Sequence, residues 1–301
     1  MKKILLFLLF SALSSSLLKA NDCEVIRASE VEVNRSVNIV MVPSNFKGDM
    51  ELFRSEAKKI LKTFETYRPF APENKLINFF LSTKEAKKNS FCEYGCAGVE
   101  RLLCCDRKDA KKLAKVCNKS DERQILVIHN DTKYGGAGYI EENMATTSIN
   151  ELAPKVAVHE LGHSLFDLAD EYIYSTSNRG LKNCATSTCQ AWSDLIESGY
   201  PGAECTPNGC AAGSSYTCGE TIMKSLSLSF GPNNERLACC KYKSITGTYP
   251  SFCAPYQKVG MGLENFCSSK SLSLKAPEFE KDQVEYFDPS GEKSGFFKIE
   301  D

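Results

Sequence analysis

The 301-residue sequence has only three histidines and one tryptophan, and it carries no excess of charge of either sign. Its 37 basic and 38 acidic side chains leave a formal net charge of −1, and the lysines and arginines form no basic run. This balance provides no electrostatic attraction to nucleic acid or to an acidic membrane surface. We therefore expect no nucleic-acid partner.

A long apolar run is also missing from the chain after residue 20, so we expect no transmembrane span in the mature protein. The first twenty residues begin with Lys2 and Lys3, continue with a short apolar run over 4–13, and end at Ala20 after small and polar residues. This order is typical of a secretory signal peptide. We expect cleavage after Ala20 and export of the mature chain, either to the periplasm or out of the cell.

Repeated Cys-x-x-Cys pairs at zinc-ribbon spacing are absent, although the chain has 15 cysteines, all after Ala20. They form three groups, at 92–117, 184–218 and 239–267, and Cys23 stands alone. So many cysteines in an exported chain favour disulfide bonds over structural zinc. The odd total leaves one thiol without a partner in the chain.

Apolar periodicity predicts strands that alternate with helices in the first half of the mature chain. The expected strands span 37–43, 75–82 and 124–130, and the expected helices span 50–67, 107–116 and 154–168. This alternation indicates an α/β fold with a mixed, mostly parallel sheet. We expect one domain over 21–270, divided into an α/β subdomain (21–168) and a disulfide-rich loop subdomain (169–270), and then a polar acidic tail (271–301).

Two of the three histidines stand four residues apart in the segment His159-Glu160-Leu161-Gly162-His163, within a predicted helix. On a helix this spacing places both imidazoles on one face, where they can hold one zinc ion. Glu160 is poorly placed to bind the same ion but can take a proton from a water molecule that the metal activates. The segment predicts a Zn²⁺ site with His159 and His163 as ligands and Glu160 as the catalytic base.

A hydrolytic zinc site needs a third protein ligand, and the remaining histidine is a poor candidate. His129 ends a predicted strand without a partner at ligand spacing, which favours a structural or surface role. Asp170 is the first choice and Glu171 the second. On an unbroken helix Asp170 would lie about 10 Å along the axis from His163, so we expect the helix to end soon after His163. The alternative is that one carboxylate holds the turn or orients a ligand histidine.

The segment HELGHSLFDLADEY (159–172) resembles the IgA-peptidase-type family of bacterial zinc metallopeptidases, which are relatives of the metzincins. A tyrosine-glycine-glycine segment, NDTKYGGAG (130–138), precedes it as in that family, and Trp192 lies in the family's tryptophan segment. TIMKSLSLSFGPNN (221–234) is similar to its methionine turn. The chain differs where relatives often have glycine, because it has Phe166 and Asp167 there.

The resemblance implies a metzincin-like catalytic domain with an active-site helix. It also implies Asp170 as the third zinc ligand and Met223 as a packing floor beneath the metal. Tyr134-Gly135-Gly136 is either an edge strand that pairs with an extended substrate or a plain glycine-rich turn. Tyr172 either helps to hold the oxyanion or is simply packed.

Together these features predict an exported zinc-dependent endopeptidase that acts on a protein or peptide substrate. A zinc-binding adhesin or interaction module on a peptidase scaffold is the alternative, and the intact Glu160 argues against it. A zinc hydrolase that acts on another bond, such as one in cell-wall peptide, is a further rival.

Overall fold

The computed structural model describes residues 22–84, 86, 90–173, 182–185, 188–210, 215–227, 229–269, 284–287 and 293–297. The predicted signal peptide lies outside these residues. The predicted tail at 271–301 is described only at β11 (Val284–Phe287) and β12 (Lys293–Phe297), which pair antiparallel. Within the described parts of the chain, no helix is both long enough and apolar enough to cross a membrane.

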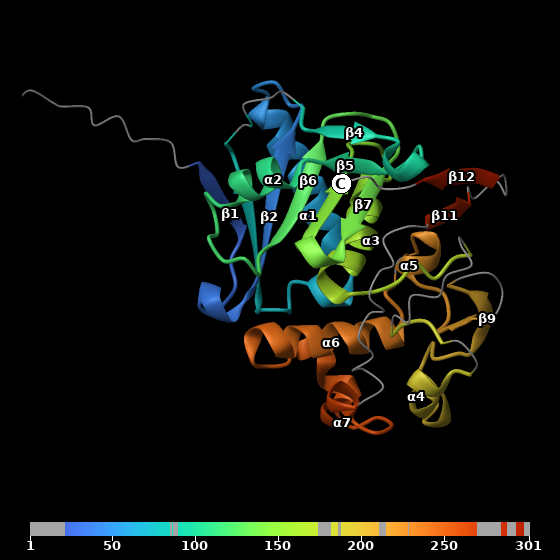
Figure 1. The fold of residues 1–301 in the computed structure, drawn as a ribbon. Coiled ribbons are helices and arrows are strands. Elements are labelled where there is room, and N and C mark those ends of the chain that lie inside the picture. Colours follow the sequence, from blue (N-terminus) through green and yellow to red (C-terminus); the bar gives the residue numbers. More distant parts are fainter. Residues whose placement is uncertain are drawn as a thin grey trace, which may run out of the picture.

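A six-stranded mixed sheet forms the upper part of the fold (Figure 1). Its order is β1 (Cys23–Arg27), β3 (Ile77–Ser82), β2 (Val37–Ser44), β6 (Gln124–His129), β8 (Met144–Thr147) and β7 (Gly136–Tyr139). The four inner strands run parallel, whereas β1 and β7 pair antiparallel at the two edges. The predicted α/β class with a mostly parallel sheet is therefore confirmed.

Both faces of this sheet are covered, which explains why β2 is buried along its whole length. On one face, α1 (Met50–Phe64) and α3 (Ala153–Phe166) pack on the core that includes Ile39 and Met41. On the other face, α2 (Arg107–Ala114) and the hairpin of β4 (Cys92–Tyr94) and β5 (Leu103–Cys105) pack on Val40 and Val42. Consecutive side chains of β2 thus pack into the cores on opposite faces of the sheet.

The part of the chain that is described within 182–269 folds beside the sheet as helices and one hairpin, drawn from yellow to orange in Figure 1. Its elements are α4 (Ser193–Glu197), β9 (Thr206–Gly209), β10 (Ser215–Thr217), α5 (Ile222–Ser225), α6 (Pro232–Thr246) and α7 (Leu263–Ser268). Short 3₁₀ turns complete the described fold at Val33–Arg35, Arg68–Phe70, Cys96–Gly98, Ile140–Glu142, Gln190–Trp192 and Ser251–Gln257.

Seven disulfides link cysteines almost entirely within the three groups seen in the sequence. They are Cys23–Cys117, Cys92–Cys105, Cys96–Cys104, Cys184–Cys210, Cys189–Cys205, Cys239–Cys253 and Cys240–Cys267. The lone Cys23 joins the first group, and the unpaired cysteine is Cys218, which is buried. The prediction of disulfides with one unpaired thiol is confirmed.

The main elements of the first half lie within about three residues of their predicted bounds. Of the two interpretations of 134–136, the plain glycine-rich turn is wrong, because Gly136–Tyr139 is the extended strand β7. Beyond Tyr172 the chain is less irregular than expected, because α6 is a regular helix of 15 residues.

Candidate active site

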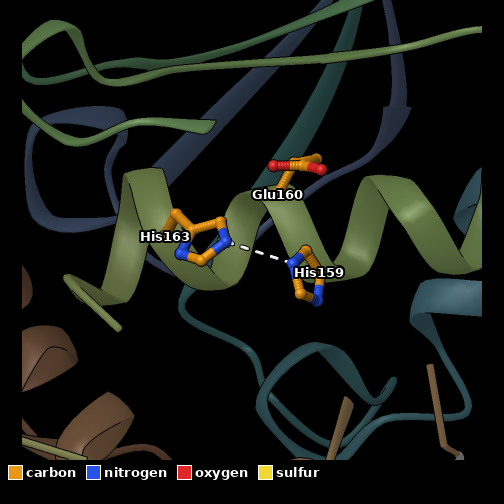
Figure 2. A group of neighbouring side chains, drawn as sticks. All are labelled: His159, Glu160 and His163. Atoms are coloured by element: carbon orange, nitrogen blue, oxygen red, sulfur yellow. Dashed lines mark hydrogen bonds between the residues drawn. The ribbon is translucent and has the colours of Figure 1, made fainter. Parts of the chain in front are cut away.

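The predicted metal-binding segment lies on α3, which packs against the edge strand β7 and against α5. His159 and His163 leave the helix one turn apart, and their Nε2 atoms lie 3.1 Å apart with the two ring planes nearly perpendicular (Figure 2). Glu160 leaves the helix beside them, and the potential ligand atoms of the three side chains lie within 4.8 Å of one another.

Each imidazole is oriented by a backbone carbonyl. The Nδ1 atom of His159 lies 2.9 Å from the Ile222 oxygen, and that of His163 lies 2.6 Å from the Leu168 oxygen. A carbonyl oxygen can only accept, so both Nδ1 atoms carry the hydrogen in the neutral rings. The two facing Nε2 atoms then present lone pairs to the same point, as metal-binding imidazoles do.

The helix ends at Phe166, and Asp167 takes the left-handed conformation (φ 56°, ψ 37°) that turns the chain back. Aspartate tolerates this conformation better than most residues other than glycine. Asp167 is also held by Lys241, whose Nζ lies 2.8 Å from its carboxylate. Phe166 stays helical and buried. The absence of glycine at positions 166 and 167 therefore does not prevent the chain from turning back after α3.

The reversal brings Asp170 to the two histidines. Its Oδ1 lies 3.0 Å from His159 Nε2 and 3.1 Å from His163 Nε2. With the 3.1 Å between the two nitrogens, these atoms form a nearly equilateral triangle. A tetrahedral zinc site with bonds of 2.0–2.1 Å has edges of about 3.3 Å, so the donor set fits zinc in both chemistry and spacing.

The charges in this cluster are strongly coupled. Burial opposes ionisation of Asp170, but the imidazoles of His163 and His159, when protonated, hold its pKa well below the usual range through charge and hydrogen bonds. Burial likewise opposes protonation of His163, but Asp170 raises its pKa to about 9. Burial raises the pKa of Glu160, and the two histidines moderate that effect. Without a cation, the cluster therefore retains a proton between Asp170 and His163.

Glu171, the second choice for the third ligand, points away from the histidines. Its carboxylate accepts hydrogen bonds from Asn183 (2.9 Å), Asn234 (2.8 Å) and Thr221 (2.5 Å). It is buried, and burial raises its pKa to about 7. Its backbone nitrogen also donates to the Met223 oxygen at 2.9 Å. Glu171 thus ties the segment after α3 to α5 and α6.

Met223 lies on α5 directly beneath α3, where it packs against Gly162. Thr221 caps α5 by accepting a hydrogen bond from the Met223 nitrogen at 3.1 Å. Ile222, between these two residues, supplies the carbonyl that orients His159. One short helix thus contributes both a packing surface and an orienting acceptor to the site.

Glycines let α3 approach β7 closely. A β-carbon at position 136 would lie 2.5 Å from Val156 Cγ1 and 3.1 Å from Glu160 Cγ. One at position 138 would lie 2.7 Å from His163 Cβ. The glycines are needed for this contact rather than for a turn. Since β7 is the last strand of the sheet, the edge-strand alternative of the two sequence interpretations agrees with the fold.

Arg101 is a residue of this region that sequence reasoning missed. Its guanidinium donates to the Tyr172 hydroxyl at 3.0 Å, and the Tyr172 ring stacks on His159 with centroids 6.5 Å apart. No motif in the sequence links Arg101 to Tyr172, which lies 71 positions further along the chain. Tyr134, 39% exposed, precedes β7 and interacts electrostatically with Glu160.

Two other candidate ligand residues, His129 and Cys218, have structural roles. His129 is buried, and its Nδ1 lies 3.1 Å from the Ser44 hydroxyl. Cys218 is buried in the core, and burial raises the pKa of its thiol to about 11. A thiol held in the neutral form is a poor metal ligand.

The family model described as IgA Peptidase M64 matches residues 32–201 of the chain. The matched region spans β2 to α4 and includes all of α3 and Asp170. No curated protein matches the chain.

Proposed function

Because the chain belongs to the IgA peptidase M64 family, we propose that it is an exported, zinc-dependent endopeptidase that hydrolyses peptide bonds by attack of water. We further propose that His159, His163 and Asp170 bind the zinc ion and that Glu160 is the catalytic base. Residues 21–270 then form a metzincin-like catalytic domain.

The observation that carries this proposal is the triangle of Nε2, Nε2 and Oδ1 atoms with sides of 3.0–3.1 Å. Three acceptors that converge without a donor repel one another unless a cation or a proton lies between them. Two imidazoles and one carboxylate are a common ligand set of catalytic zinc, which leaves a further position for substrate or water.

Glu160 is the residue that transfers the proton during hydrolysis. A bound zinc ion would polarise the substrate carbonyl and lower the pKa of a water molecule. The Glu160 carboxylate takes a proton from the attacking water and returns it to the leaving amine. Burial raises the pKa of Glu160, and a base with a raised pKa transfers protons more effectively near neutral pH.

The Gly136 end of β7 is already hydrogen-bonded to the Arg101 carbonyl, so an extended substrate could pair through backbone hydrogen bonds only along the rest of this sheet edge. Seven disulfides support export, since such bonds persist in oxidising compartments. These features do not name a particular protein as the substrate.

The test compares the oxidised protein with its Glu160→Gln variant on an unfolded protein substrate. We expect wild-type cleavage that a zinc chelator stops and added zinc restores. Glu160→Gln should bind zinc as tightly while losing about 10²–10⁴-fold in kcat. Glu151→Gln, which changes an exposed glutamate just before α3, is the matched control and should retain full activity. Wild-type turnover by Glu160→Gln would overturn the mechanism, and zinc binding without any hydrolysis would favour an interaction module.

A further inference from the structure

The side chain of Asn183 holds the residue just before Asp170. The Ala169 nitrogen donates to Asn183 Oδ1 at 2.8 Å, and the Ala169 oxygen accepts from Asn183 Nδ2 at 2.9 Å. A backbone N–H only donates and a carbonyl only accepts, so these two bonds fix the orientation of the amide. The second hydrogen of Nδ2 goes to the Glu171 carboxylate at 2.9 Å. Asn183 is fully buried, so water does not compete for these bonds.

The residue just after Asp170 is held through its backbone. The Glu171 nitrogen donates to the Met223 oxygen at 2.9 Å, and the Glu171 oxygen accepts from the Cys210 nitrogen at 3.2 Å. Ala169 and Glu171 therefore each use both of their backbone polar groups, and rotation of either residue would break a hydrogen bond. The backbone that carries the third proposed zinc ligand is thus restrained from both sides.

A disulfide joins the two sides of this arrangement. Cys184, the neighbour of Asn183, is bonded to Cys210, which holds Glu171. The Cys184 sulfur also lies 3.8 Å from the Asp170 carbonyl oxygen. The two cysteines are 26 positions apart, so the cross-link removes most of the freedom of one side relative to the other. We call Asn183, Cys184 and Cys210 the Asp170 clamp.

We propose that Asn183 and the Cys184–Cys210 disulfide are positioning elements, which keep the Asp170 carboxylate at the metal site. The proposal rests on the proposed function of that site. Asp170 lies in the segment after α3, so its distance from the two histidines depends on where that segment is held. Zinc bonds vary by only about 0.2 Å in length, so a small shift of the segment is enough to weaken the site. Supporting contacts of this kind typically change metal affinity by about 10–100-fold.

The alternative role of the clamp is to stabilise the folded chain in general. A disulfide restricts the unfolded chain, and this effect does not depend on Asp170. The two roles give different results in a protein that lacks the Asp170 carboxylate. A positioning effect on zinc affinity disappears together with that carboxylate, whereas a general effect on the site remains.

The experiment measures the zinc affinity of the oxidised protein by competition with a chelating dye. The test variants are Asn183→Ala and the paired change Cys184→Ser with Cys210→Ser, which adds no free thiol. Each is made in the wild-type chain and in Asp170→Ala. Thermal unfolding of the zinc-free proteins shows whether each variant folds. If Asn183→Ala does not fold, the disulfide variant decides the result alone.

Two matched changes are the controls. Asn74 is also a buried asparagine that bonds backbone groups with its side chain, but those groups lie within 69–76. The Cys189–Cys205 disulfide lies in the same cysteine group as the clamp, and in the described parts of the chain no hydrogen bond joins either cysteine to 169–171. Asn74→Ala and the paired change Cys189→Ser with Cys205→Ser should therefore bind zinc as the wild type does.

In the wild-type chain we expect Asn183→Ala to weaken zinc binding by about 10–100-fold, and loss of the Cys184–Cys210 disulfide to weaken it by a smaller factor. In Asp170→Ala, which itself binds zinc more weakly, the same changes should cause no further loss, because they act through the missing carboxylate. Unchanged zinc binding in either folded variant would overturn the proposal. Equal losses with and without the Asp170 carboxylate would overturn it as well.

The design separates the two proposals. A wild-type protein that binds no zinc contradicts the proposed function, and the clamp then has no ligand to position. A wild-type protein that binds zinc and cleaves protein, together with clamp variants that bind zinc equally well, contradicts only the positioning role of the clamp.

Discussion

Met223 packs against Gly162, the residue of α3 that lies between Leu161 and His163 in the metal-binding segment. A β-carbon at position 162 would collide with the Met223 sulfur, so any larger residue must displace either the helix or α5. Overpacking of a close-packed core costs about 1–3 kcal/mol. We predict that Gly162→Ala lowers the free energy of unfolding by this amount and weakens zinc binding.

Chemical denaturation of the zinc-free proteins measures the effect. Met223→Ala alone creates a cavity, and combining it with Gly162→Ala should relieve the collision. The double variant should therefore be more stable than the sum of the two single losses predicts. Strict additivity would show that Gly162 and Met223 do not constrain each other.

The left-handed conformation of Asp167 makes the end of α3 sensitive to β-branched residues. Asp167→Val places a branched side chain at φ 56°, which strains the backbone by about 1–3 kcal/mol. We predict a loss of this size in unfolding free energy and weaker zinc binding, because the turn carries Asp170. Asp167→Asn, which tolerates the same conformation, should keep zinc affinity within about threefold. Equal behaviour of the two variants would contradict this account of the turn.

The Asp194–Arg236 pair predicts an acid-dependent loss of stability. Burial opposes ionisation of Asp194, but the hydrogen bond from Arg236 at 2.8 Å and the charge of Arg236 lower its pKa. A lowered folded pKa adds stability that is present above the unfolded value of about 3.9 and is lost as pH falls through the folded value. Asp194→Asn should therefore lower Tm at pH 6, by an amount that shrinks below about pH 4.

Thermal unfolding between pH 2 and pH 7 measures this dependence. Asp121→Asn is the control, because Asp121 is fully exposed and should give no comparable change. A difference between Asp194→Asn and wild type that stays constant down to pH 2 would show that the charge of Asp194 does not matter.

The cross-linked β4–β5 hairpin gives a prediction about the removal of one of its disulfides. Cys96–Cys104 links the two sides of the turn that carries Arg101. Replacing both cysteines with serine should loosen this turn, which is bonded to β7 beside α3, and weaken zinc binding. The double replacement Cys240→Ser and Cys267→Ser, which removes a disulfide of α6 and α7, is the control. Equal zinc affinity in all three proteins would show that Arg101 is held without the cross-link.

The sequence predicted the first half of the fold well because apolar periodicity there follows the burial of regular elements. β2, β3 and β6 are buried apolar strands, and α1 has one apolar face. The prediction missed α6 because its buried side includes polar residues. Asn233, Asn234, Glu235 and Arg236 are all buried there and find partners far away in the sequence.

In the candidate site, too, local sequence patterns predicted some residues, and the tertiary fold alone brings in the others. Helical spacing alone brings His159, Glu160 and His163 together. The approach of Asp170 required a left-handed residue after the helix, which the sequence does not mark because Asp167 is not glycine. Glycine in 134–138 suggested a turn, yet its cause is the contact with α3. Arg101 reaches the site only through the hairpin fold, so no local pattern could reveal it.

The most direct test is a crystal structure of Glu160→Gln grown with zinc, with anomalous scattering recorded on both sides of the zinc edge. We predict one strong peak bonded to His159 Nε2, His163 Nε2 and an Asp170 carboxylate oxygen. A site without a peak, or a zinc ion bound by Glu171 or elsewhere instead of Asp170, would contradict the account.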